Sequence, residues 1–145
     1  TTPGVGDPEG MRLEDCASQR NLSEEGRADA RALGEALRRH GVPVARVLSS
    51  PGCRCRETAR LVFGGEAEVV PALGNLFGRR EREAAQMAQM RELVAAAPRR
   101  GNLFFVTHGS TTLALTGVSP GTGEMVIVTP QRAGGFRVAG RLVAR

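Results

Sequence analysis

The sequence predicts an α/β fold, a three-layer sandwich with a mainly parallel central sheet and a truncated first strand. Amphipathic helical segments alternate with short apolar strands along the chain. The continuous apolar run 103–106 is typical of a strand that is buried on both faces. The chain has 145 residues, of which 41% are hydrophobic and 24% charged, so we expect one globular domain over residues 1–145.

The first part of the chain is expected to be a long loop followed by a helix. Residues 1–22 contain several Pro and Gly and show no apolar period. Ser23 can cap a helix that carries Glu24 and Glu25 in its first turn and closes at His40. In a parallel sheet a strand should lead into this helix. We therefore expect that a strand upstream of the sequence has been lost.

The remaining elements follow from local signals. Residues 44–48 are predicted to form a strand that runs into a helix, with Ser50 as its cap and Pro51 at its first position. Further strands are expected at 67–70, 103–106, 124–129 and 136–143, and further helices at 80–97 and 111–115.

Composition narrows the class of partner. The formal net charge is +5, and every basic residue is Arg, which suits recognition of carboxylate or phosphate but is explained more simply by codon usage. Five Phe and no Trp or Tyr leave no aromatic surface on which bases could stack, so no nucleic-acid partner is expected. No apolar run approaches the roughly 20 residues of a membrane span, so no membrane partner is expected.

The three cysteines are Cys16, Cys53 and Cys55. They form no C-x-x-C pair and lack a matching histidine cluster, so a zinc site is not expected. Buried, unreactive thiols are the favoured interpretation. A disulfide from Cys16 to either Cys53 or Cys55 stays open for an oxidising compartment.

Two polar segments, 49–54 and 107–110, follow predicted strands, where ligands of open α/β sheets collect. Arg54 lies in the first turn of its helix, where the dipole disfavours a cation unless an anion binds; a water-exposed Arg is the alternative. His108 precedes Gly109, which allows close approach of a ligand; a structural histidine is the alternative. Arg56 is assigned to the surface, and His40 to the end of its helix.

Several short motifs occur in a fixed order along the chain. Their combination is more specific for a protein family than any single motif is. They are N-L-S-E-E-G-R at 21–27, L-S-S-P at 48–51 with Arg54 and E-T-A at 57–59, and V-T-H-G at 106–109. Over about residues 1–130 the chain thereby resembles the histidine phosphatase superfamily, the phosphoglycerate-mutase-like group. The resemblance implies an anion pocket of two Arg and two His, with Arg54 as the second Arg, His108 as the second His, and Gly109 beside it.

The first Arg and the nucleophilic His of that family stand in an R-H-[GA] motif with no counterpart here. Thr1 or Thr2 looks like the Thr that follows this motif, so we expect the sequence to begin just downstream of it. The family's general acid also has no counterpart, because segment 73–76 contains no acid and Glu81 and Glu83 fall in a predicted surface helix.

The resemblance implies a phosphatase that acts through a phosphohistidine on phosphorylated small molecules or phosphohistidine proteins. Arg54 and His108 are the implied catalytic and phosphate-binding residues, and no metal or other cofactor is expected, because two Arg and a protonated His can neutralise the phosphate. Whether this chain is itself an enzyme stays open, since the nucleophile is absent and we expect no turnover.

The alternative is a degenerate, non-catalytic member that binds a phosphate or a phosphoprotein. Bacterial members with similar D-P-x-G and C-A-x-Q-R-N-L-S segments look exported, so both periplasm and cytoplasm remain open. The sequence does not indicate the oligomeric state.

Overall fold

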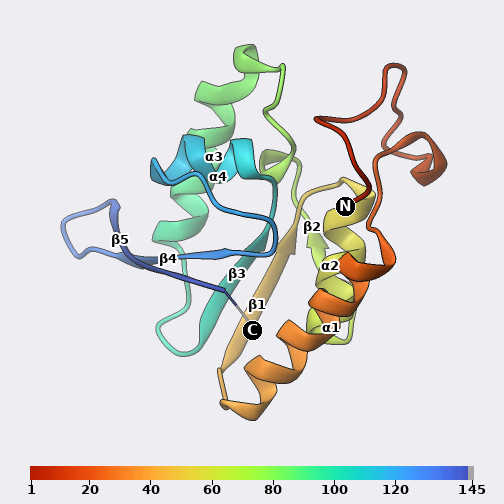
Figure 1. Ribbon diagram of the computed structural model, residues 1–145. Coiled ribbons are helices and arrows are strands. Elements are labelled where there is room, and N and C mark those ends of the chain that lie inside the picture. Colours follow the sequence, from red (N-terminus) through yellow and green to blue (C-terminus); the bar gives the residue numbers. More distant parts are fainter. Residues whose placement is uncertain (144–145) are drawn as a thin grey trace.

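A computed structural model describes residues 1–143 (Figure 1). The helices are α1 (Glu24–Arg39), α2 (Cys53–Phe63), α3 (Glu83–Ala95) and α4 (Gly109–Thr116). The strands are β1 (Val44–Ser49), β2 (Glu68–Val69), β3 (Asn102–Val106), β4 (Met125–Pro130) and β5 (Phe136–Leu142). Short 3-10 turns cover Cys16–Ser18, Pro71–Leu73 and Arg80–Arg82.

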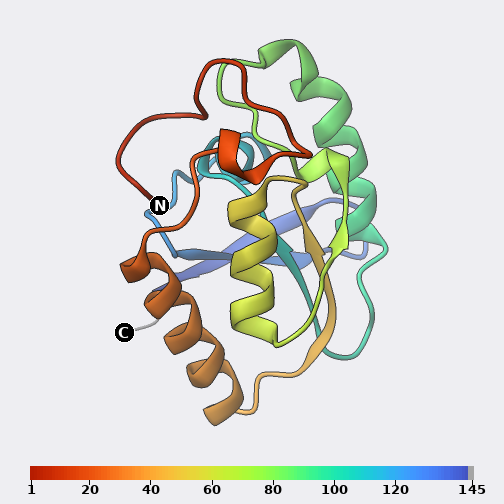
Figure 2. The same ribbon diagram turned by 90° about the vertical axis from the view of Figure 1, so that its right-hand side faces the viewer.

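The central sheet is parallel, as the sequence predicts. Strand β1 lies between β2 and β3 and pairs in parallel with both. Helices α1 and α2 cover one face of this sheet, and α3 and α4 cover the other (Figures 1 and 2). The three-layer α/β class is therefore confirmed. Strands β4 and β5 form a separate antiparallel hairpin.

The sheet separates two apolar cores because alternate side chains of a strand point to opposite faces. Leu48 of β1 is fully buried against α3 and the 71–73 turn, and Phe105 of β3 packs beside it. On the other face, Phe104 of β3 packs with a core formed by α1 and α2. The buried members of the two cores are, respectively, Leu48, Ala72, Leu73, Leu76, Met87 and Met90, and Ala30, Leu37 and Val62.

Helix α1 begins as predicted, with the Ser23 hydroxyl accepting a hydrogen bond from the Gly26 N–H at 3.1 Å. The predicted start of α2 was wrong: its cap is Gly52, and Ser50 is not part of the helix. The reason is tertiary, because the Ser50 N–H donates to the Val106 carbonyl at 2.9 Å and so prolongs the pairing of β1 with β3.

Other boundaries differ modestly from expectation. Strand β2 is shorter than the predicted 67–70, and α4 is longer than the predicted 111–115 because it begins directly after His108. Within residues 1–143, no helix has the length and apolar character needed to cross a membrane.

Candidate functional site

The carboxyl ends of β1 and β3 lie side by side and place Ser50 beside His108. The two strands are in parallel register, with Ser49 opposite Val106. The segments that follow the two strands continue past the edge of the sheet. The side chains of Ser50 and His108, which lie in these segments, therefore meet. The Ser50 Oγ lies 2.7 Å from the His108 Nε2, and both residues are buried.

Arg54 reaches the same histidine from the first turn of α2. Its residue exposure is only 7%, which contradicts the alternative of a water-exposed Arg. Its Nη2 lies 3.0 Å from the His108 Nδ1. A guanidinium can only donate hydrogen bonds, so the Nδ1 accepts and the imidazole proton is on the Nε2, from which it is donated to Ser50.

This environment keeps His108 neutral. Burial, together with the positive charge of Arg54, lowers the pKa of His108 from 6.5 to about 4. The resemblance led us to expect a protonated His108. In this structure His108 is neutral at pH 7, so that expectation was wrong. The physical reason is that the imidazole is buried, and a proton on its Nδ1 would face the Arg54 guanidinium 3.0 Å away.

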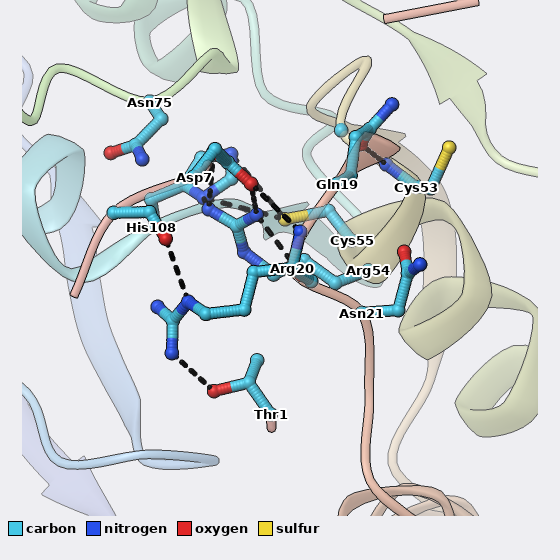
Figure 3. A network of polar contacts seen from close by, with 12 residues as sticks. Thr1, Asp7, Gln19, Arg20, Asn21, Cys53, Arg54, Cys55, Asn75 and His108 are labelled. Carbon is cyan, nitrogen blue, oxygen red and sulfur yellow. Dashed lines mark hydrogen bonds and ion pairs between the residues drawn. The ribbon is translucent and has the colours of Figure 1, made fainter. Parts of the chain in front are cut away.

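Asp7 supplies the negative charge opposite Arg54 (Figure 3). Its Oδ1 lies 2.5 Å from the Arg54 Nη1 and its Oδ2 3.2 Å from the Nη2, and the side-chain exposures of Asp7 and Arg54 are 10% and 8%. Burial by itself raises the pKa of Asp7, but Arg54 and hydrogen bonds from Arg20 and Asn75 outweigh burial and hold this pKa below 3.8. The pair is thus ionised, bidentate and buried.

Arg20 folds the N-terminal loop around Asp7. Its Nε donates to the Gly6 carbonyl at 2.7 Å, and its Nη1 donates to the Thr1 hydroxyl at 2.9 Å. The Arg20 N–H donates to the Asp7 Oδ1 at 3.3 Å, while its carbonyl accepts from the Arg54 Nη1 at 3.3 Å. One loop residue therefore touches both members of the buried ion pair.

Gln19 and a disulfide fasten the loop to the start of α2. The Gln19 side-chain carbonyl accepts from the Cys53 N–H at 2.9 Å, which satisfies an otherwise free amide of the first helical turn. Cys16 and Cys53 form a disulfide with Cα atoms 5.7 Å apart. The favoured interpretation of three unreactive thiols was therefore wrong for these two, because only the folded loop brings Cys16 against α2.

Cys55 is the free, buried cysteine, and its Sγ lies 3.6 Å from the His108 Nε2. Burial raises the pKa of this thiol to about 12, although Arg54 and a hydrogen bond from Ser50 oppose the rise. The group therefore stays a thiol and packs against the imidazole rather than acting as a nucleophile.

The structure brings Arg54 and His108 together, as the sequence predicts. Gly109 is exposed at the start of α4, and a Cβ there would meet nothing within 4 Å, so its role beside a ligand stays a prediction. Arg56 is exposed, and His40 caps the end of α1, as expected. Within residues 1–143, no three His, Cys, Asp or Glu side chains gather as metal ligands would.

Sequence reasoning missed the roles of several site residues. Asp7, Gln19, Arg20 and Asn75 lie in loops, and Cys55 lies within α2. Ser50 was expected only as a helix cap, and its contact with His108 was not predicted. The signal was present in part, because D-P-x-G and C-A-x-Q-R-N-L-S contain Asp7, Gln19 and Arg20. Nothing in either segment by itself points to Arg54, which lies far along the chain.

A family model described as histidine phosphatase superfamily (branch 1) matches residues 16–92, more than half of the chain. The chain belongs to the histidine phosphatase superfamily. The matched range includes Arg54 and ends before His108. None of the curated protein sequences matches the chain significantly.

Solved structures share the fold of this chain. The protein histidine phosphatase SixA, complexed with tungstate, is 20% identical, with 86% of this chain and 85% of that chain covered and a TM-score of 0.62. A SixA phosphohistidine phosphatase assigned in Agrobacterium tumefaciens is 22% identical over 95% and 90% of the two chains, with a TM-score of 0.60. A phosphoserine phosphatase mutant from Entamoeba histolytica, in complex with phosphoserine, is 12% identical over 83% of each chain, with a TM-score of 0.61.

Proposed function

We propose that this chain carries the phosphate-binding part of a phosphatase-type site, in which Arg54 and His108 bind the phosphoryl group of a phosphorylated small molecule or a phosphohistidine protein. The observation that carries this proposal is the buried contact between the Arg54 guanidinium and the His108 imidazole at the ends of two adjacent parallel strands. Family membership and the phosphatases among the similar folds support it.

The chemistry of the two groups suits a phosphoryl dianion. Arg54 offers two N–H donors in a planar fork, which matches phosphate geometry. A dianion beside His108 would favour the protonated imidazole, since an opposite charge stabilises the charged form. The Nδ1 would then change from an acceptor for Arg54 into a second donor toward the phosphate. Positioning and charge neutralisation of this kind supply most of the catalysis in phosphoryl transfer.

Hydrolysis through a phosphohistidine requires an imidazole nitrogen with a free lone pair facing phosphorus. The lone pair of His108 is taken by Arg54, and the chain's other histidine, His40, is exposed at the end of α1. We therefore expect the 145-residue chain to bind phosphate without turning over phosphomonoesters, with the nucleophile supplied from outside these residues.

The second hypothesis is a non-catalytic binder of phosphate or phosphoprotein with the same pocket. The single imidazole at the site favours it. The coding sequence immediately upstream of Thr1 separates the two hypotheses: an R-H-[GA] motif there supports the enzyme, and unrelated residues support the binder.

The phosphate site is tested by the melting temperature of the chain with and without phosphate or vanadate. A ligand that binds only the folded state at about 100 times its Kd adds about 2.7 kcal/mol, which is a shift of several degrees. We expect Arg54→Ala and His108→Ala each to abolish the anion-dependent shift. Arg56→Ala, two residues away on the exposed face of α2, should keep it.

Equal shifts in all four proteins would show that the anion acts through general surface charge, and the site would be wrong. Hydrolysis of phosphomonoesters is measured on the same preparations. Robust turnover that survives purification would contradict the expected inactivity and locate a nucleophile within the chain.

A further inference from the structure

The Arg54 guanidinium already holds an anion that belongs to the protein. Both carboxylate oxygens of Asp7 contact it, at 2.5 Å and 3.2 Å, and neither side chain is more than 10% exposed. A phosphate that used the same two Arg54 nitrogens would have to take the place of this carboxylate. The Asp7 carboxylate therefore occupies the position that the proposed function assigns to the substrate.

We propose that Asp7 is an internal competitor for Arg54, so that the N-terminal loop closes the site until a phosphoryl group displaces the carboxylate. This inference rests on the proposed function, because it requires that phosphate bind at Arg54. It adds a regulatory role for the loop, which the phosphate site by itself does not require.

The Asp7 carboxylate can be displaced because Arg54 belongs to a helix and Asp7 to a loop. Arg54 is fixed in the first turn of α2, whereas Asp7 lies in a loop whose side chains hold it in place. Asp7 also lines a hollow of about 290 Å³ between residues 2–8 and the pair Gln19 and Arg20, which gives the displaced carboxylate a place to move. A dianion makes stronger charge-assisted contacts to a guanidinium than a single carboxylate does.

The competition has a measurable consequence. If only chains with Asp7 displaced can bind phosphate, the apparent Kd is the intrinsic Kd divided by the fraction of such chains. Removal of the Asp7 charge ends the competition, so the apparent Kd falls toward the intrinsic Kd. It also leaves Arg54 without a negatively charged partner. A carboxylate that merely positions Arg54 would have the opposite effect, because its removal would weaken phosphate binding.

The test is calorimetric titration of inorganic phosphate into wild type, Asp7→Asn and Asp7→Ser. We expect both variants to bind phosphate at least about tenfold more tightly than wild type. Asp29→Asn is the matched control, because it makes the same change of charge at an exposed position on α1. Its affinity should stay within about twofold of wild type.

The variants are refolded in saturating phosphate, which supplies the missing negative charge at Arg54, and the phosphate is removed by dialysis before the titration. Failure of both to fold under these conditions, while Asp29→Asn folds, would overturn the proposal, because phosphate would then not replace Asp7. Phosphate binding to wild type with equal or weaker binding to the variants would also overturn it and leave the proposed function standing. No binding to any of the proteins would remove both.

Discussion

The site is assembled from two regions that are held by different forces. The strand-end half consists of Ser50, Arg54 and His108, which follow β1, begin α2 and follow β3. Backbone pairing of the sheet and the helix itself fix these positions. The loop half consists of Asp7, Gln19 and Arg20, which side-chain hydrogen bonds and the Cys16–Cys53 disulfide hold against α2.

Because of this difference, the loop half can open while the sheet stays intact. Local opening costs least where few backbone hydrogen bonds and apolar contacts must be broken. In the strand-end half, removal of a side chain leaves a buried partner without its hydrogen bond. The free energy of global unfolding therefore decreases. The ion pair between Asp7 and Arg54 joins the two halves.

The largest effect is expected where the halves join. Arg54→Ala leaves the Asp7 carboxylate buried without its partner and should lower the free energy of unfolding by about 3–5 kcal/mol. The double variant Asp7→Ala/Arg54→Ala should lower the free energy of unfolding by less than Arg54→Ala does, since no uncompensated charge remains. Urea denaturation measures both, with Arg56→Ala as a surface control expected within about 0.5 kcal/mol of wild type. Equal costs for Arg54→Ala and Arg56→Ala would show that loss of Arg54 leaves no uncompensated charge at Asp7.

An effect of similar size is expected from the disulfide, which holds only the loop half. The cysteines are 37 positions apart, and a cross-link over a loop of this length is worth about 4 kcal/mol in the chain-entropy model. A dithiol reductant should lower the stability of wild type by about this amount, and hydrogen exchange should increase in residues 1–22 before it increases in β1 and β3.

The Cys16→Ser/Cys53→Ser variant should be insensitive to the reductant. Cys55→Ala should keep the wild-type sensitivity, because Cys55 is the free thiol. A Cys55→Ala protein that ignores the reductant would show that Cys55 forms the disulfide.

The smallest of the three effects concerns the strand-end half and its dependence on pH. The folded-state pKa of His108 is about 4 against an ordinary 6.5, so between these values the unfolded chain binds a proton that the folded chain does not. The stability contributed by neutral His108 is therefore complete above pH 6.5 and is lost as the pH falls to about 4, by about 3 kcal/mol in total.

His108→Gln should flatten this pH dependence, whereas His40→Gln on the exposed end of α1 should keep it. Titration of the imidazole signals by NMR gives the same pKa directly. A His108 that titrates near 6.5 would mean that its burial beside Arg54 does not persist in solution.

Local sequence signals are sufficient to predict the regular elements of this protein. The cap at Ser23 and the apolar run 103–106 are local signals, and they predicted α1 and β3 correctly. Arg54 and His108 could be predicted to converge because each follows a strand of a parallel sheet, whose carboxyl ends meet at one edge. The motifs around them also indicated the histidine phosphatase superfamily, to which the chain belongs.

The residues that surround those two side chains come together only through long-range contacts. Asp7 meets Arg54 across 47 positions of sequence, and Cys16 meets Cys53 across 37. Neither segment of the loop has a helical or strand period, so nothing local specifies its path. The neutral state of His108 has the same origin, since its pKa depends on burial and on the charge of a residue 54 positions away. The protonation states of such a site depend on charges from distant parts of the chain. Their interaction becomes strong only when folding removes these groups from water.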